Sequence, residues 1–438
     1  MDSKSKRQID EASAHVAALY HAGRYAEAVR VAEWLCRMTE THSYPTHPDA
    51  ATILNNLALL YKTLGDFARA ELLYQRALAI CENVLGPEHR NTARSLDNLA
   101  ALYQALGEFA RAEPLHRRAL AICEKTLGIE HPDTAQILNN LAALYEARGD
   151  SARAEPLYRR ALAICEKVLG VEHPNIAQIL DNLAGLYYKM FNFGRAEQLY
   201  QRALAIRENV LGPEHPYTAR SLNNLALLYN SAGDHARAEP LLQRALAIHE
   251  IVLGPKHPDT ATSLNNLALL YRSLGDHARA APLLQRALAI RESILGAEHP
   301  DTATSLNNLA ELFHALGDFA RAEPLLQRAL AIHEIVLGPK HPDTATSLNN
   351  LALLYRSLGD HARAAPLLQR ALAIRENILG AEHPDTGASL NNLAGLFQAL
   401  GDFGRAEPLL QRALAICESI LGAEHPDTGA SLNNLAGL

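Results

Sequence analysis

The sequence is poor in aromatic residues and contains no long apolar run. Aromatic side chains account for 5% of the 438 residues, yet 48% are hydrophobic, mostly Leu and Ala. These two residue types enter helices at little cost and lack the β-branch typical of strands. No apolar run approaches the roughly 18 residues of a membrane-spanning helix, and the chain opens with charged residues where a secretory leader would be apolar. We therefore predict an all-α cytoplasmic protein without a membrane partner.

Cysteine and net charge are also low. Four of the five cysteines, Cys81, Cys123, Cys165 and Cys417, occupy one position of a repeat. Neighbouring helices lie about 8–10 Å apart, beyond the roughly 7 Å that a disulfide spans, so we predict that these residues and Cys36 are reduced thiols. The formal net charge of −7 gives no basis for nucleic-acid binding or for an acidic disordered chain.

The chain is built from a repeat of 42 residues. The string Leu-Asn-Asn-Leu-Ala, or its Leu-Asp-Asn variant, begins at Leu54 and recurs every 42 residues up to Leu432. We divide the chain into an N-terminal tail (1–9), a degenerate first unit (10–48), nine complete units (49–426) and a truncated unit (427–438). Positions within a unit are counted from Ala51, so that equivalent positions lie 42 residues apart.

Each unit is predicted to form two helices. His257 is placed at an N-cap, with proline at the first helical position. Gly275 ends this helix, since glycine tolerates a left-handed turn. Asp276 then caps a second helix that runs to about Gly296, with a bend expected at Pro282. Repeated Arg and Glu residues on the second helix, such as Arg69, Glu71, Arg76 and Glu82, are interpreted as exposed ion pairs.

One face of the first helix carries a conspicuous polar pattern. At about 100° per residue, positions 4, 7, 8 and 11 form an apolar face that packs, and positions 2, 5, 6, 9, 12 and 13 point away from it. Asn recurs at position 6 in all ten copies, although Asn is a middling helix former. Helix stability alone does not account for it.

These residues resemble the tetratricopeptide repeat. The resemblance rests on the spacing of Leu54, Leu57, Ala58, Tyr61, Gly65, Ala70, Tyr74 and Ala77, and the 42-residue period resembles the kinesin-light-chain type. The resemblance implies an α-solenoid, a right-handed superhelix of antiparallel helix pairs whose first helices line a concave groove. In such proteins the groove binds extended peptide segments of partner proteins, with Asn side chains holding the peptide backbone.

Carried onto this sequence, the resemblance assigns the Asn pair to the groove. The position-6 residues are Asn56, Asn98, Asn140, Asn182, Asn224, Asn266, Asn308, Asn350 and Asn392. Position 5 contributes Asn55, Asn139, Asn223, Asn265, Asn307, Asn349 and Asn391, whereas Asp97 and Asp181 depart from the pattern. The alternative is that these amides bridge adjacent helices by side-chain hydrogen bonds and bind no ligand.

Other groove positions vary between units. Position 2 supplies Arg94 and Arg220, and position 12 supplies Arg272, His314 and Arg356. Counting the four arginines with Lys62 and Lys189, six basic residues stand against four acidic ones, namely Asp97, Glu146, Asp181 and Glu311. We expect the later half of the groove to prefer a ligand with acidic side chains or a free C-terminal carboxylate. Ordinary variation of a solvated surface is the competing interpretation.

No catalytic or metal-binding motif is found. A histidine recurs every 42 residues from His47 to His425, which predicts an N-cap rather than a metal ligand. His249 and His333 begin like a zinc-protease helix, but leucine stands where the second ligand would be. We therefore predict a protein that is not an enzyme and needs no cofactor.

The first functional hypothesis is a scaffold that binds a partner segment in its groove. The second makes the array the sensor or regulatory arm of a larger enzyme, such as a nucleotide-binding switch protein or a caspase-like protease. The chain stops inside a unit and leaves Leu435 and Leu438 without a polar cap, so we expect either truncation or, as a third hypothesis, self-association through this end.

Overall fold

The computed structural model describes residues 3–41, 48–422 and 426–437, which form 21 α-helices in consecutive antiparallel pairs. The first helices of the units are α1 (Ser3–His21), α3 (Pro48–Thr63), α5 (Arg90–Ala105), α7 (Pro132–Ala147), α9 (Pro174–Lys189), α11 (Pro216–Ser231), α13 (Pro258–Ser273), α15 (Pro300–Ala315), α17 (Pro342–Ser357), α19 (Pro384–Ala399) and α21 (Pro426–Ala436). The second helices are α2 (Tyr25–Thr41), α4 (Phe67–Val84), α6 (Phe109–Thr126), α8 (Ser151–Leu169), α10 (Phe193–Leu211), α12 (His235–Val252), α14 (His277–Ile294), α16 (Phe319–Val336), α18 (His361–Ile378) and α20 (Phe403–Leu421). The predicted all-α solenoid is confirmed.

The helix ends follow from the residues that repeat there. His257 caps α13, because its Nδ1 accepts the backbone N–H of Asp259 (3.1 Å). Gly275 ends the pair's first helix with φ +74°, and Asp276 caps α14. Pro282 lies inside α14, which continues through it. α1 begins at Ser3 and so contains most of the segment assigned as the N-terminal tail, while His47 and His425 lie outside the described residues.

The core is built from small residues that bring helices close together. In the first complete unit, Ala58 of α3 and Ala70 and Ala77 of α4 are fully buried, as are their equivalents in the other complete units. Leucine and tyrosine side chains fill the space between these contacts, as Leu60 and Tyr74 do. Within the described parts of the chain, no helix combines the length and apolarity that crossing a bilayer requires.

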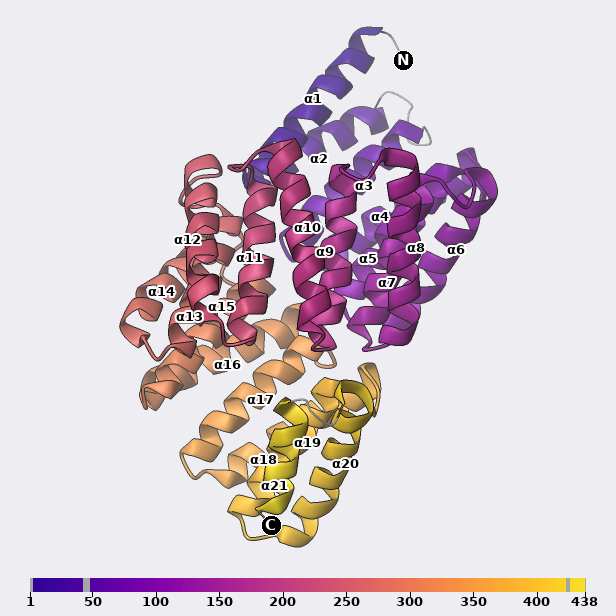
Figure 1. Ribbon diagram of the computed structural model, residues 1–438. Helices are drawn as coiled ribbons and strands as arrows, with labels where there is room; N and C mark the ends of the chain where they lie inside the picture. The colour runs from indigo at the N-terminus through magenta and orange to yellow at the C-terminus, as the bar shows by residue number, and fades with distance from the viewer. Residues whose placement is uncertain (1–2, 42–47, 423–425, 438) are drawn as a thin grey trace.

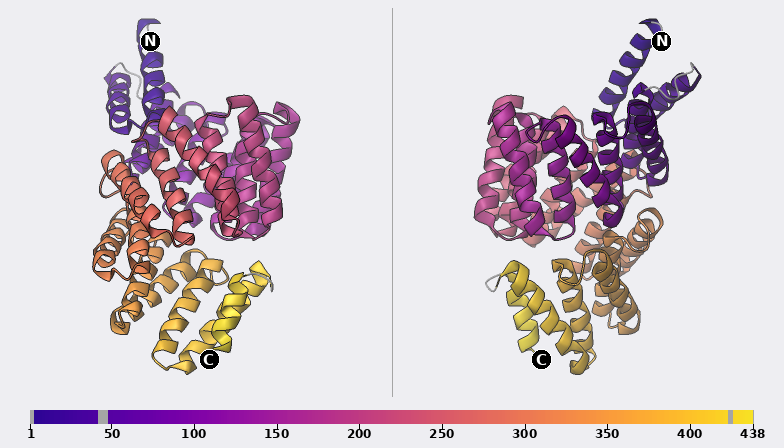
Figure 2. Two further views of the ribbon diagram at one scale, coloured as in Figure 1. Left: turned by 60° about the vertical axis from the view of Figure 1, so that its left-hand side comes forward. Right: turned by 90° about the vertical axis from the view of Figure 1, so that its right-hand side faces the viewer.

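The array curves into a superhelix. First helices one unit apart touch one another, whereas second helices one unit apart come less close, so the first helices lie on the inner side of the curve. In Figures 1 and 2 the last helices, α17–α21, lie beneath those of the N-terminal half. The chain therefore completes one superhelical turn and begins a second one below it.

The two turns meet at four equivalent contacts, which we call the seam. The N-cap histidines of α13, α15, α17 and α19 lie against glycines that end α1, α3, α5 and α7: His257 against Gly23, His299 against Gly65, His341 against Gly107 and His383 against Gly149. The His299 Nε2–H donates to the carbonyl oxygen of Thr63 (3.0 Å), and His341 Nε2–H to that of Ala105 (3.2 Å). The partners in each bond are 236 residues apart.

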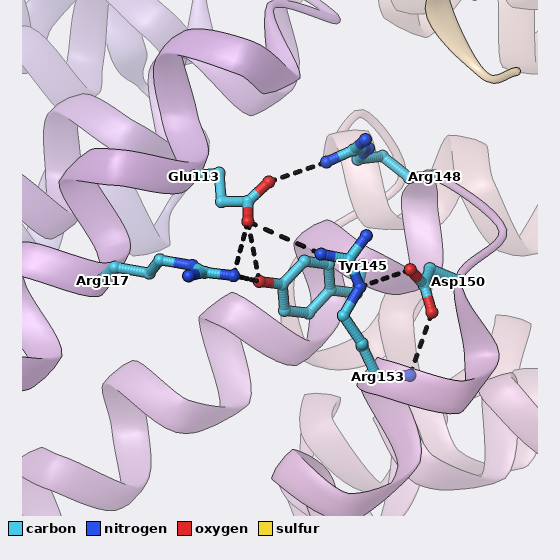
Figure 3. Close-up of polar contacts among 6 residues, drawn as sticks. All are labelled: Glu113, Arg117, Tyr145, Arg148, Asp150 and Arg153. Carbon is cyan, nitrogen blue, oxygen red and sulfur yellow. Dashed lines mark hydrogen bonds and ion pairs between the residues drawn. The ribbon is translucent and has the colours of Figure 1, made fainter.

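A second repeated contact joins each unit to the next (Figure 3). The Tyr145 hydroxyl on α7 donates to Glu113 of α6 (2.9 Å), and the Arg148 guanidinium binds the other oxygen of that carboxylate (2.7 Å). The guanidinium of Arg153 on α8 lies 4.3 Å from the centre of the Tyr145 ring and pairs with Asp150, the cap of the same helix. One tyrosine thus connects the second helices of two units.

This network revises the interpretation of the repeated charges as exposed ion pairs. The Glu71-type carboxylates are partly buried acceptors for a tyrosine of the following unit. The Arg76-type guanidinium pairs with the Glu82-type carboxylate of the preceding unit, as Arg118 does with Glu82 (2.7 Å). Where the glutamate is replaced, by Ala281 or Ala365, the next unit has Phe313 or Phe397 instead of tyrosine.

We expect Tyr271 and Glu239 to be energetically coupled. Tyr271→Phe removes the hydroxyl that donates to Glu239 (2.9 Å), at an expected cost of about 1 kcal/mol in unfolding free energy. Glu239→Ala alone should cost a similar amount, and the double variant recreates the Ala281–Phe313 combination. Urea unfolding of the four proteins should give a double loss smaller than the sum of the single losses. Strictly additive losses would show that the pair is not coupled.

Candidate protein-interaction groove

Side chains of the first helices form the inner wall of the superhelix. Position 2 is accessible in every complete unit, as at Arg94 and Thr262, and positions 9, 12 and 13 are half-buried or exposed. Position 5 is different, because its side chains are buried or half-buried between neighbouring first helices. The predicted groove face therefore divides into an accessible part that varies and a covered part that repeats.

The covered part is a ladder of amide hydrogen bonds. Position-5 Nδ2 groups donate to a serine of the next unit, as from Asn223 to Ser263 Oγ (2.9 Å). Position-6 Nδ2 groups donate back to the position-5 oxygen of the preceding unit, as from Asn182 to Asn139 (2.9 Å). Equivalent back-donations come from Asn98, Asn140, Asn308 and Asn392.

These bonds are the helix-bridging alternative that the sequence left open. They occupy one Nδ2–H of each donating amide, and a primary amide has a second one. Asn56 is exposed, whereas Asn266 is 9% exposed and Asn350 donates to Glu311 (3.1 Å). A direct contact of the Asn side chains with a bound peptide remains a prediction, and the ladder gives them a structural role without it.

The two aspartates at position 5 are buried and paired. Asp181 and Arg207 form an ion pair of 2.5 Å with both side chains at most 4% exposed. Burial raises the pKa of Asp181, and the Arg207 guanidinium opposes that shift. The carboxylate of Asp97 lies 2.8 Å from Nδ1 of His116 and accepts a bond from Asn140 (2.8 Å). Neither aspartate contributes to the charge of the accessible wall.

Three of the six basic groove residues have internal partners. Lys62 Nζ donates to the carbonyl oxygen of Ala101 (3.1 Å), and burial lowers the pKa of this amine. Lys189 pairs with Glu146 (2.8 Å). Arg272 pairs with Glu311. The two accessible acidic residues are therefore already neutralised by cations of the array.

The other basic residues form hydrogen bonds or contacts with neutral groups and no ion pair among the described residues, although the charge of Arg220 also acts to lower the pKa of Asp181. Arg94 Nη2 donates to Thr52 Oγ1 (3.3 Å), and Arg220 donates to the side chain of Gln178. Arg356 Nη1 lies 2.9 Å from the point where a side chain on Gly395 would begin. His314 Nε2 lies 2.8 Å from Ser357 Oγ. In the described part of the chain, three guanidinium groups along the inner wall thus lack an ion pair.

A buried polar series at position 31 was not anticipated from the sequence. It comprises Cys81, Cys123, Cys165, Arg207, His249, Arg291, His333, Arg375 and Cys417, and none of the cysteines is in a disulfide. Each Arg or His in the series contacts a serine of the next first helix, as Arg291 does with Ser305 (2.8 Å). The sequence contains a signal for this contact, because a serine lies 14 residues after each Arg or His of the series.

The comparisons with known proteins agree with this architecture. The tetratricopeptide repeat model matches residues 11–83, 49–125, 97–167, 133–209, 175–251, 222–293, 275–335, 301–377, 343–419 and 385–438. No curated protein sequence matches the chain. Among solved structures, the Rap protein complexed with competence and sporulation factor is 16% identical, with a TM-score of 0.54 over 85% of this chain and 99% of Rap.

Two further structures share more sequence but superpose less well. The nearly identical TPR-like repeats from Podosopora anserina, assigned to a kinesin light chain, are 34% identical (TM-score 0.40; 47% of this chain, 97% of that one). BtubC (BKLC) from P. vanneervenii is 30% identical (TM-score 0.42; 54% of this chain, 92% of that one). The repeat model covers nearly the whole sequence. The chain therefore belongs to the tetratricopeptide repeat family, whose members generally serve as protein-interaction scaffolds and are typically non-catalytic.

Proposed function

We propose that the protein is a scaffold whose inner wall binds an extended, acidic segment of a partner protein. The observation that carries this proposal is the charge left over after internal pairing. Both accessible acidic residues, Glu146 and Glu311, form ion pairs with Lys189 and Arg272, whereas Arg94, Arg220 and Arg356 form no ion pair among the described residues. A carboxylate of the partner would supply the missing counter-charge, and charge-assisted hydrogen bonds are the strong ones.

Arg272 and Arg356 show what such a carboxylate would do. They are equivalent residues two units apart, and each points toward position 9 of the following unit. At Arg272 that position is Glu311, whose carboxylate binds the guanidinium. At Arg356 it is Gly395, which has no side chain to offer. A carboxylate from a bound segment can approach Arg356 as Glu311 approaches Arg272.

Binding can be tested with two fluorescent peptides of about ten residues, one of alternating Glu and Ser and one of alternating Lys and Ser. We expect the protein to bind the acidic peptide at moderate salt and Arg356→Gln to weaken that binding about 5–10-fold, as expected for one charge-assisted contact. Fluorescence anisotropy at two salt concentrations measures both effects, because exposed charge pairs weaken as salt rises.

Glu311→Leu is the matched control, since leucine occupies the equivalent positions 269 and 353. This variant releases Arg272 from its internal partner, and we expect it to bind the acidic peptide more tightly than the natural protein. Equal binding of the two peptides, or an acidic-peptide affinity unchanged by both substitutions, would refute the proposed charge preference.

A further inference from the structure

The seam brings together two surfaces that also occur, uncovered, on the outer edges of the superhelix. One surface is the N-terminal cap of a first helix, with its His-Pro sequence. The other is the Leu-Gly turn that ends a first helix. Within the seam, caps of the second turn cover four such glycine turns of the first turn, and the turns at Gly65 and Gly107 are Leu-Gly. The equivalent residues of the remaining units point away from the seam.

The lower edge of the second turn carries uncovered Leu-Gly turns. Leu316 is 50% exposed, and no atom lies within 4 Å of where a side chain on Gly317 would begin. In the seam, the equivalent Leu64 is half-buried, and His299 lies 3.1 Å from the same point on Gly65. The turns have similar backbones, since φ is +74° at Gly317 and +76° at Gly65, and both are followed by Asp-Phe. Further uncovered turns end at Gly275, Gly359 and Gly401.

The upper edge of the first turn carries uncovered caps. His131 caps α7 as His299 caps α15, and both are followed by Pro-Asp-Thr. The side chain of His131 is 36% exposed, compared with 8% for His299 in the seam. His173 and His215 are also partly exposed caps. One edge therefore offers the donors of the seam, and the opposite edge offers its acceptors.

We infer that a second copy of this chain stacks on the first, with the caps of its upper edge on the Leu-Gly turns of the lower edge. The contact extends the seam, and it is heterologous because the two edges differ. A heterologous contact of this kind adds copies in one direction, so the product is an open stack. The bound copy covers Leu316 and Gly317 in the same way that His299 covers Leu64 and Gly65 within one chain.

Each single contact in the stack is weak. Open clefts flank the seam contacts, one of about 500 Å³ between Leu64–Ala68 and Leu295–His299 and one of about 460 Å³ between Ala22–Glu27 and Leu253–His257, so the seam is not packed like a protein interior. Several contacts act together because all are fixed on one rigid array, which raises the overall affinity. Stacking should therefore depend steeply on the number of intact turns along an edge.

Sedimentation of the purified protein over a concentration series tests the stack. We expect the weight-average mass to rise above the 47.8 kDa of one chain as the concentration increases. A lower-edge variant, Gly317→Asn with Gly359→Asn, should stay at the mass of one chain. Asparagine tolerates the left-handed conformation, so the fold is kept, while its side chain occupies the place of the docking histidine. Circular dichroism checks that helicity is unchanged.

An upper-edge variant completes the test. His131→Asn, His173→Asn and His215→Asn together keep N-capping side chains but remove the imidazole rings that would dock. This variant alone should also remain at one chain. Mixing it with the lower-edge variant should restore association but stop at two chains, because only one pair of intact edges remains. A natural protein that stays at one chain, or association that survives either set of substitutions, would overturn the inference.

Discussion

At about pH 5 the protein is expected to have a larger radius of gyration than at about pH 7.5, because protonated histidines no longer fit the seam. In the closed seam His299 Nδ1 accepts a backbone N–H, and its Nε2–H donates to Thr63. The ring is therefore neutral, and protonating Nδ1 removes an acceptor. Burial lowers the pKa of His257, His299, His341 and His383, and the Asp301-type carboxylates oppose this shift.

The sign of the effect follows from proton uptake. Above about pH 6.5 both the closed and the separated forms hold neutral histidines, so pH has no effect on the seam. Below that value the separated form binds protons that the closed form excludes. The closed form then loses up to about 1.4 kcal/mol per pH unit for each histidine. The loss stops growing only below the lowered pKa values of the closed form, where the histidines of both forms are protonated.

Small-angle scattering at the two pH values measures the change, at a protein concentration low enough that the chains do not stack. A variant with asparagine at positions 257, 299, 341 and 383 keeps the caps but cannot form the imidazole bonds, so it should be extended at both pH values. Asparagine at positions 131, 173 and 215 changes equivalent caps outside the seam and should leave the natural pH response intact. A radius that does not change with pH in the natural protein would contradict the role of these histidines.

Arg207→Cys is expected to destabilise the array by about 3–5 kcal/mol, because it leaves the buried Asp181 carboxylate without its cation. Adding Asp181→Asn should recover most of that loss. The double variant reproduces a combination that the array already contains, since Asn55 lies with Cys81 and Ser95 at the equivalent interface. Urea midpoints of the single and double variants give the coupling between the two residues.

Arg291→Cys is the matched control for this substitution. Arg291 is equivalent to Arg207, but it contacts Ser305 and the carbonyl oxygen of Asp301, and the carboxylate whose charge acts on it, that of Asp301, is 60% exposed. Removing it leaves no buried anion, so we expect a loss of about 1 kcal/mol or less. If Arg291→Cys proved as harmful as Arg207→Cys, the loss would come from packing and not from the ion pair.

The sequence was sufficient to predict whatever depends on one unit. The cap at His257, the turn at Gly275 and the cap at Asp276 each depend on neighbours within a few residues, and all three are found in the structure. The sequence was less informative about the environment of the position-5 aspartates. They look like groove charges on a helical wheel, but Asp181 is covered by α10, and only the packing of the pairs shows that.

The seam could not be predicted, because it depends on how small rotations add up over many units. His299 and Thr63 are 236 residues apart, and no local pattern relates them. The proposed charge preference of the groove has a further signal in the sequence. Arg272 and Arg356 are identical in sequence context up to their own helices, but the residues at position 9 of the next unit, Glu311 and Gly395, differ.

Because a histidine cap and a turn that ends in glycine recur in nearly every unit, the seam does not depend on particular partners. A chain that gained or lost one 42-residue unit in the middle of the array would pair different copies of the histidine and glycine, but it would form the same contact. The fourth complete unit is the exception, since Phe191 stands where the others have glycine, with φ +55°. Copy number can therefore change by whole units without redesigning the contact between turns, provided that this phenylalanine does not have to accept a cap.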